Sequence, residues 1–140
     1  MTLHSVGLSE NDVVDAVATF LTQQKWSVTQ ALRTTEQGVD LIAKRGTERL
    51  LLEAKGGTST SVTSARWGKP FTTSQQRDHV AKAVAVACEL RSREPDARVV
   101  IAFPDSRTHR ARIEAVRYAL EQLGISAFLV GPDLTVEQLF

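Results

Sequence analysis

Two carboxylates and a lysine, Asp40, Glu53 and Lys55, have types and spacing suited to a metal ion that faces phosphate. Mg²⁺ prefers oxygen ligands, commonly binds one or two carboxylates, and completes its shell with water and substrate phosphate. A lysine beside such an ion adds a compact positive charge. These three side chains therefore predict a Mg²⁺ site if the fold brings them together.

A predicted β-hairpin brings the two carboxylates together. Residues 39–45 and 48–55 are apolar segments of strand length, and residues 46–47, Gly and Thr, suit a two-residue hairpin loop with glycine first. Counting outward from this loop along the two antiparallel strands places Asp40 directly opposite Glu53. Side chains two residues apart share a face of a strand, so Lys55 projects beside Glu53.

Like charges that lie directly opposite one another weaken a hairpin. The repulsion between Asp40 and Glu53 should therefore be offset by another group. A divalent cation or a shared proton would remove the conflict. The alternative is a solvated hairpin end where the three side chains form a weak surface ion pair. The strand argues against that alternative, because Leu50, Leu52 and Ala54 alternate with Leu51 and Glu53, a pattern typical of a covered sheet.

The order of Asp40, a short hairpin and then Glu53-x-Lys55 resembles the PD-(D/E)xK phosphodiesterase superfamily, and is nearest in pattern to Holliday junction resolvase-like nucleases. Val39 stands where the motif has its proline. The resemblance implies a DNA nuclease that uses Mg²⁺, with Mn²⁺ as a substitute, to hydrolyse phosphodiester bonds. In such an enzyme Asp40, Glu53 and the Ala54 carbonyl would bind the ion, while Lys55 would orient the attacking water.

The resemblance also suggests Glu10 as an extra metal ligand. Residues 9–24 predict a helix, and Glu10 lies on the same stripe as the apolar Val13, so its side chain should point toward the sheet. Asp12 and Asp15 compete for this role. All three carboxylates also fit a simpler role, in which they complement the helix dipole.

The second predicted helix, capped by Ser74 and running to about residue 90, offers further candidates. Members of the superfamily often carry a glutamine or lysine near its start, which implies a catalytic role for Gln75. Gln75, His79 and Lys82 share one helix face and could contact DNA phosphates, although an exposed face without function is equally compatible.

The segment before this helix is a long polar loop, residues 56–73, that suits a DNA interface. It carries Arg66 and Lys69, and the wider segment 44–82 has a net charge of +5, against −3 in the first 43 residues. Arg66 and Lys69 are predicted nucleic-acid contacts. Trp67 between them could stack on a base, or it could anchor the loop to the core.

The remaining pattern predicts an α/β fold. We expect strands at 26–32, 98–103 and 125–130, a helix at 106–123, and a helical turn from Leu134. The resulting order αβββαβαβ is that of a restriction endonuclease-like three-layer α/β/α fold with a mixed sheet, in one domain spanning residues 1–140.

The amino-acid composition indicates the class of protein and where it acts. A hydrophobic content of 42% with 24% charged residues is ordinary for a soluble globular chain. No apolar stretch approaches the roughly 20 residues that span a bilayer, and no signal peptide is visible, which together predict a cytoplasmic protein without membrane contact. DNA is the predicted partner, in restriction, repair, recombination or a mobile element.

Two other functions stay open at the level of sequence. The chain shows no separate DNA-recognition domain, so it could be a catalytically silent nuclease-fold module that binds DNA or protein, with a partner protein supplying target recognition, and a homodimer is also compatible. Residues 55–58, Lys-Gly-Gly-Thr, follow a predicted strand and could form a phosphate-binding loop, but they lack the G-x(4)-G-K-[ST] arrangement.

Overall fold

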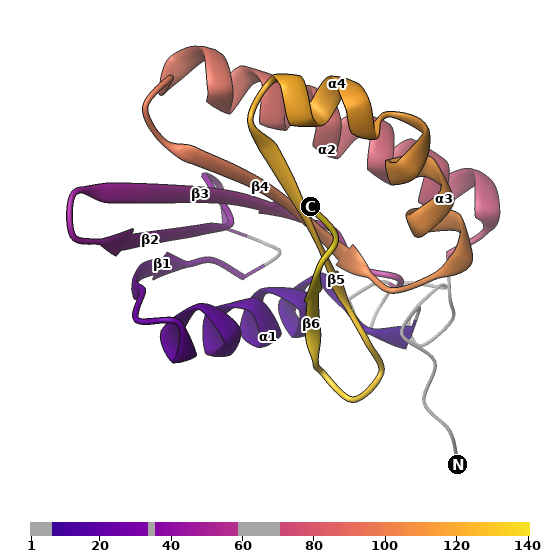
Figure 1. Ribbon diagram of the computed structural model, residues 1–140. Helices are drawn as coiled ribbons and strands as arrows, with labels where there is room; N and C mark the ends of the chain where they lie inside the picture. The colour runs from indigo at the N-terminus through magenta and orange to yellow at the C-terminus, as the bar shows by residue number, and fades with distance from the viewer. Residues whose placement is uncertain (1–6, 34–35, 59–70) are drawn as a thin grey trace.

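A six-stranded sheet runs through the molecule with helices on both faces (Figure 1). The computed structural model describes residues 7–33, 36–58 and 71–140. In chain order the elements are α1 Glu10–Gln23, β1 Ser27–Ala31, β2 Leu41–Arg45, β3 Glu48–Ala54, α2 Thr73–Arg93, β4 Arg98–Pro104, α3 Arg107–Ala115, α4 Arg117–Gln122, β5 Ile125–Val130 and β6 Val136–Gln138.

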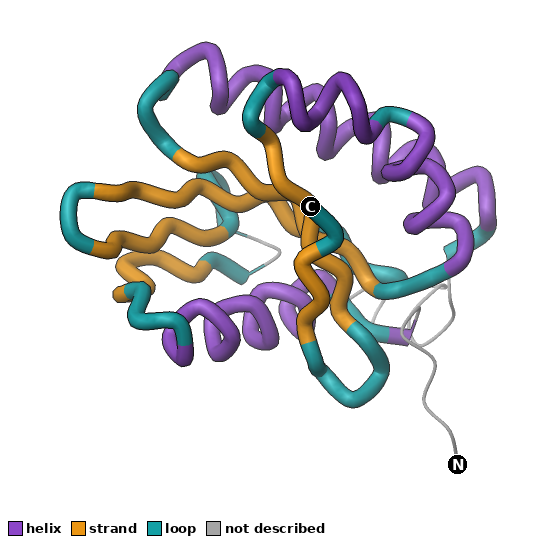
Figure 2. The backbone as a smooth tube through the Cα atoms, viewed as in Figure 1, coloured by secondary structure: helices purple, strands orange, loops and turns teal. Residues whose placement is uncertain are grey.

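The strands lie in the sheet in the order in which they occur along the chain, β1 to β6 (Figure 2). β3, β4 and β5 are parallel to one another, whereas β1, β2 and β6 join the sheet antiparallel. The β1–β2 pairing is irregular, because its register shifts between Val28 and Gln30. The prediction of an α/β fold with a mixed sheet is confirmed.

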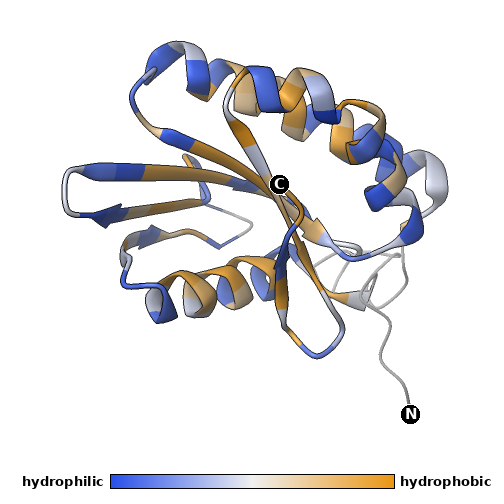
Figure 3. Cartoon of the chain, viewed as in Figure 1, coloured by the Kyte–Doolittle hydropathy of each residue, from blue (hydrophilic) through white to orange (hydrophobic). Residues whose placement is uncertain are grey.

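Two apolar cores hold the helices to the sheet. α1 packs on one face through Val13, Val17 and Leu21, while α2, α3 and α4 cover the other face, where Phe103 and Ile113 are fully buried. Figure 3 shows the apolar strands between these two helical layers. Within the described ranges, no helix combines the length and the apolar character needed to cross a membrane.

The β2–β3 hairpin has the predicted register. Gly46 adopts a positive φ of 62° in the two-residue loop, a conformation that glycine reaches without strain. The pairing runs from Arg45 opposite Glu48 to Leu41 opposite Leu52. The hairpin therefore delivers the residues next to its open end, Asp40 and Glu53, to the same place.

The second helix begins earlier than predicted, and Ser74 is not its cap. Thr72 is the N-cap: its side chain accepts a hydrogen bond from the Gln75 backbone, and the Gln75 side chain accepts one from the Thr72 backbone. This reciprocal pair is a capping box, which satisfies two backbone N–H groups that a Ser74 cap would leave unpaired.

Two further predictions at the C-terminal end are wrong. The helix expected over residues 106–123 is divided at Val116, a β-branched residue with φ −114° that breaks the helical path between α3 and α4. The helical turn expected from Leu134 is replaced by β6, because Leu134 has a φ of 67° and sits in a tight turn in which Gly131 and Thr135 are hydrogen-bonded. That turn sends the chain back along β5.

A close backbone contact joins the start of α1 to the end of β3. A Cβ atom placed on Gly56 would lie 2.3 Å from the Glu10 nitrogen and 2.7 Å from the Ser9 carbonyl carbon. The neighbouring Gly57 N–H donates to the Leu8 carbonyl at 2.7 Å. Only glycine at position 56 lets these two backbones approach so closely.

Replacing Gly56 with alanine should therefore destabilise the protein by about 1–3 kcal/mol, because the backbone at Glu10 must move. Urea unfolding followed by circular dichroism measures the loss. Gly7→Ala is the matched control, since a Cβ there meets nothing within 4 Å, and it should change the free energy of unfolding by less than about 0.5 kcal/mol. Equal stability of the two variants would contradict the close contact.

Candidate active site

Asp40 and Glu53 form a carboxyl pair at the end of the hairpin. The ladder pairs Leu41 with Leu52, so the next pair outward is Asp40 and Glu53. Leu51 belongs to the core beneath α2 and Leu52 to the core above α1, so Glu53 projects on the α2 side. The two carboxyl groups are within hydrogen-bonding reach of one another.

The pair is also held by the backbone. The Ala54 N–H donates to Asp40 Oδ2 at 2.8 Å, which fixes the Asp40 carboxylate against the last residue of β3. Glu53 is only 9% exposed. The predicted convergence of Asp40, Glu53 and Ala54 is thus present in the structure, whereas their role as metal ligands stays a prediction.

Burial makes negative charge unfavourable at both carboxyl groups. Burial, reinforced by the neighbouring Asp40 charge, raises the pKa of Glu53 to about 7. Burial likewise raises the pKa of Asp40, against the opposing effects of the Ala54 N–H and the Lys55 charge. Two adjacent carboxyl groups with raised pKa values can share a proton, or they can share a cation that replaces it.

Lys55 stands beside this pair as predicted. Its backbone N–H donates to the Ala102 carbonyl at 3.0 Å, which continues the parallel pairing of β3 with β4. Its Nζ lies 3.4 Å from Glu53 Oε1, and the two side chains are 22% and 12% exposed. The ammonium group is therefore partly covered and close enough to offset charge at the pair.

The start of α1 brings Glu10 toward the same place. The contact at Gly56 sets the Glu10 backbone beside the end of β3, and the Glu10 charge contributes to the raised pKa of Glu53. Its competitors have other partners: the Asp12 carboxylate accepts from the Ser9 backbone, and Asp15 pairs with Arg33 at 2.6 Å. Glu10 as a ligand stays a prediction.

Across the described parts of the chain, no group of three or more His, Cys, Asp or Glu side chains is arranged to hold a metal ion. The site is therefore built on two carboxylates and differs from a closed metal cage. Such a pair suits Mg²⁺, which usually keeps several waters and takes the rest of its ligands from the substrate.

The predicted residues of α2 lie in three different environments. The Gln75 side-chain oxygen accepts from the Thr72 backbone in the capping box. His79 is half-buried against the Phe71 ring, and Lys82 is exposed. A catalytic role for Gln75 and DNA contacts by Gln75, His79 and Lys82 remain predictions.

The predicted DNA contacts Arg66 and Lys69, with Trp67 between them, fall outside the described residues. Sequence reasoning did not single out two other positions. Gly56 is marked only by the Gly-Gly pair after Lys55. Gln76 is 7% exposed, and its signal is that it lies four residues before Val80 on the buried stripe of α2.

The phosphate-loop alternative finds no support in the geometry. A phosphate-binding loop needs free backbone N–H groups, but the Gly57 N–H is bonded to Leu8 and the Lys55 N–H to Ala102. Gly56 packs directly on the α1 backbone. These contacts use the glycines to join α1 to β3.

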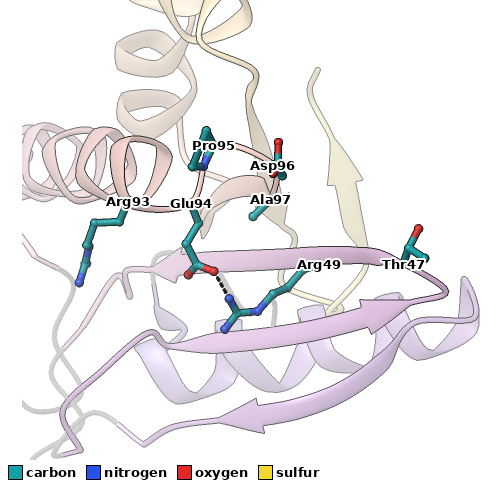
Figure 4. Close-up of a pocket in the computed structure, with 7 residues that line it drawn as sticks. All are labelled: Thr47, Arg49, Arg93, Glu94, Pro95, Asp96 and Ala97. Carbon is teal, nitrogen blue, oxygen red and sulfur yellow. Dashed lines mark hydrogen bonds and ion pairs between the residues drawn. The ribbon is translucent and has the colours of Figure 1, made fainter.

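A separate cavity of about 320 Å³ lies at the opposite end of β3, next to the β2–β3 loop (Figure 4). It is lined by Thr47, Arg49, Arg93, Glu94, Pro95, Asp96 and Ala97. Arg49 and Glu94 form an ion pair across it. Two arginines and two carboxylates line this cavity, so its lining has no net charge that would attract a charged substrate.

Two solved structures resemble this chain over nearly its whole length. One is an XisH family protein from Nostoc punctiforme, which superposes with a TM-score of 0.55 at 16% identity and covers 91% of this chain and 97% of its own. This chain has the same fold. The other is an fdxN element excision controlling factor protein from Anabaena variabilis, with a TM-score of 0.54, 17% identity, and coverage of 92% and 98%.

Comparison with protein families and with curated proteins finds no match to the sequence. The resemblance to the two solved structures therefore establishes the fold, and the chemistry of the site has to be argued from its own residues.

Glu53 should make the stability of the protein depend on pH. The folded state holds the Glu53 proton up to about pH 7, whereas the unfolded chain releases it near its ordinary pKa of 4.5. Between these values the folded state binds more protons, so stability falls as pH rises and then levels off. A shift of this size corresponds to at most about 3 kcal/mol.

Glu53→Gln should remove this dependence. We expect the variant to match the wild type near pH 4.5 and to exceed its free energy of unfolding by about 1–3 kcal/mol at pH 8, measured by urea unfolding across the range. Glu89→Gln, on the exposed side of α2, serves as the control and should follow the wild-type curve. A variant that is less stable than the wild type at pH 8 would show that the Glu53 charge is well compensated.

Proposed function

We propose that this protein is a Mg²⁺-dependent DNA nuclease of the PD-(D/E)xK type, with Asp40, Glu53 and Lys55 as its catalytic residues. The supporting observation is the pair of half-buried Asp40 and buried Glu53, with the Lys55 ammonium 3.4 Å from Glu53. A purely structural site gains nothing from two adjacent carboxyl groups that are half-buried and buried. A site that binds a cation and a phosphate uses both of them.

The residues of the pair fit a hard divalent cation. Carboxylate oxygens are the ligands that Mg²⁺ prefers, and the raised pKa values of Asp40 and Glu53 mark a place where added positive charge is favourable. When bound, the ion would polarise the scissile phosphate. Asp40, Glu53 and the Ala54 carbonyl would hold it.

The other roles in the proposed reaction belong to residues of this chain. The Ala54 N–H keeps Asp40 oriented, and Lys55 would orient the attacking water and offset the charge that develops on the phosphate. Positioning and electrostatics carry the reaction, without a covalent intermediate.

The structural neighbours support a setting in DNA rearrangement. One of them is described as an excision controlling factor of an fdxN element, and both share the fold of this chain at 16–17% identity. We therefore favour recombination or a mobile element over the other settings that the sequence allowed, with DNA as the substrate.

The alternative is a nuclease-fold module that binds DNA or protein without cleaving. Within the described residues no three-residue metal cluster exists, and this favours the alternative to the extent that catalysis needs a third protein ligand. The two functions differ in one result: the module binds DNA with Mg²⁺ or Mn²⁺ present and leaves it intact.

Purified protein should nick or degrade DNA with Mg²⁺ or Mn²⁺ and be inactive in EDTA. Glu53→Gln and Lys55→Ala should each lower the cleavage rate by about 100-fold or more, because each removes a group from the reacting centre. Lys44→Ala removes the same charge from an exposed position of β2 and should cleave like the wild type. Unchanged cleavage in the Glu53 and Lys55 variants would refute the assignment.

Metal binding can be followed without activity. At pH 8, millimolar Mg²⁺ should raise the thermal unfolding midpoint of the wild type, because an ion that binds only the folded state stabilises it. Asp40→Asn and Glu53→Gln should lose this increase, whereas Glu89→Gln should keep it. An equal increase in all four proteins would place the ion elsewhere.

A further inference from the structure

The helices α2 and α3 are basic, whereas α1, on the other face of the sheet, is acidic. α2 and α3 together carry seven basic and three acidic side chains, a net charge of +4. α1 carries three carboxylates and no basic side chain, a net charge of −3. The two sides of the protein therefore differ in charge (Figure 1).

Three arginines of the basic helices form no ion pair with a carboxylate of the described residues. They are Arg77 on α2 and Arg107 and Arg112 on α3, and all three are exposed. Other arginines do lie against Asp or Glu, namely Arg33, Arg45, Arg49, Arg98, Arg110 and Arg117. Asp78 follows Arg77, but successive residues of a helix do not face each other. The charge of the three arginines is therefore open to a ligand.

A side-chain hydrogen bond joins the beginnings of the two basic helices. Ser106, the N-cap of α3, donates through Oγ to Gln76 Oε1 near the start of α2, at 3.2 Å. Arg77 and Arg107 are the next residues along the two helices. This contact therefore brings the backbones that carry the two arginines close together.

Arg112 projects toward the same side of α3 as α2. Arg110 pairs with Glu137 of β6, so its side of the helix faces β6. Arg112 lies two residues further along, about 200° around the helix axis. It therefore projects away from β6, toward the side where α2 lies.

This basic surface begins at the end of the sheet that holds the carboxyl pair. The Lys55 N–H donates to the Ala102 carbonyl at 3.0 Å, so the parallel strands β3 and β4 finish at the same end. α3 begins three residues after β4, and the N–H of Phe71, just before α2, donates to the Gly57 carbonyl at 2.7 Å. Both helices therefore start beside the site, as Figure 1 shows.

The side chains around the arginines favour nucleic acid over protein as the ligand. Ala81 and Ala111, one turn beyond Arg77 and Arg107, are exposed and small. The large exposed apolar side chains of the described residues lie outside both helices, at Tyr118, Leu123 and Leu134. A protein interface needs apolar or aromatic anchors at its centre. A DNA backbone is bound by cations instead, and a guanidinium group fits phosphate through two parallel hydrogen bonds.

We propose that Arg77, Arg107 and Arg112 form a contact surface for the phosphate backbone of DNA. This surface holds the duplex on the α2 and α3 side of the site, away from the acidic α1. The inference rests on the proposed function for the nature of the ligand, and it extends that function by naming the side of the molecule on which DNA lies. Backbone contacts carry no sequence information, so the surface binds DNA of any sequence.

DNA binding without cleavage tests the proposal. Glu53→Gln protein in EDTA is titrated with a fluorescent duplex, and the anisotropy gives Kd over a range of salt concentrations. Arg77→Gln, Arg107→Gln and Arg112→Gln added together should raise Kd at least about 10-fold at physiological salt and lower the salt dependence of binding by about three phosphates. Two duplexes of unrelated sequence should show the same loss.

Arg117→Gln is the matched control for this triple glutamine variant. It makes the same substitution on α4, but the Arg117 guanidinium is paired with Glu114 at 3.3 Å and with Glu121 at 2.8 Å. Its Kd should stay within about 2-fold of the parent, and replacing the three arginines with lysine, which keeps the charge, should stay within about 3-fold. An unchanged Kd and salt dependence in the triple glutamine variant would overturn the proposal, and so would an equal loss in Arg117→Gln.

Cleavage assays separate this inference from the proposed function. In protein with Glu53 intact, the triple glutamine variant should raise KM for DNA, with kcat changed less than about 3-fold. Cleavage with an unchanged KM would overturn the inference alone. If the wild type cleaves no DNA with any metal, a loss of binding in the triple variant would still support the surface while the nuclease assignment fails.

An acidic protein partner is the competing ligand for this surface. Polyglutamate serves as its probe in the same anisotropy assay, by competition with the labelled duplex. A triple glutamine variant that keeps its affinity for DNA but loses the affinity of the wild type for polyglutamate would overturn the DNA contact and assign the surface to an acidic protein.

Discussion

The antiparallel register of β2 and β3 governs the position of every group at the site. The two-residue loop at Gly46 leaves one pairing in which Asp40 faces Glu53, and both project on the side covered by α2. A slip of one residue would turn Glu53 toward α1 and remove it from Asp40. The apolar residues of β3 prevent that slip, since it would exchange the faces of a strand that is buried on both sides.

The cores on either side of the sheet stabilise a site whose own electrostatics are unfavourable. Two carboxyl groups lie together where burial raises the pKa of each, and one lysine offsets them in part. Such an unfavourable arrangement of carboxyl groups is typical of a functional site, where a bound ligand offsets their charge. The segment after β3 contacts the start of α1 at Gly56, and its Gly57 carbonyl accepts from the N–H of Phe71, just before α2. Parts of the chain that are far apart in sequence therefore hold the site.

The parts of the structure that sequence reasoning predicted are those set by local pattern. The hairpin register follows from strand length and loop residues, so the convergence of Asp40, Glu53 and Lys55 could be predicted without coordinates. The approach of α1 to Gly56 could not, because it depends on long-range packing that a glycine permits but does not specify. The turn at Leu134 is similar, since a left-handed leucine has no signal in sequence.

The start of α2 shows a different limit of prediction from sequence. Thr72 and Gln75 form a capping box that the sequence displays, but Ser74 offers a competing cap two residues later. The cap decides the role of Gln75, whereas the spacing of four residues from Gln76 to the buried Val80 turns Gln76 inward. The structure leaves Gln75 at the cap and buries Gln76, whose side-chain oxygen accepts a hydrogen bond from Ser106 Oγ at 3.2 Å.

The irregular register between Val28 and Gln30 has a consequence for how the protein behaves at high concentration. β1 and β6 are the two edges of the sheet, and an exposed regular edge invites strands from other molecules to add to it. The irregularity in β1 interrupts the row of hydrogen-bonding groups on one side, and on the other β6 spans only Val136–Gln138. Both borders are therefore poor templates for aggregation, which protects a chain whose central strands are almost wholly apolar.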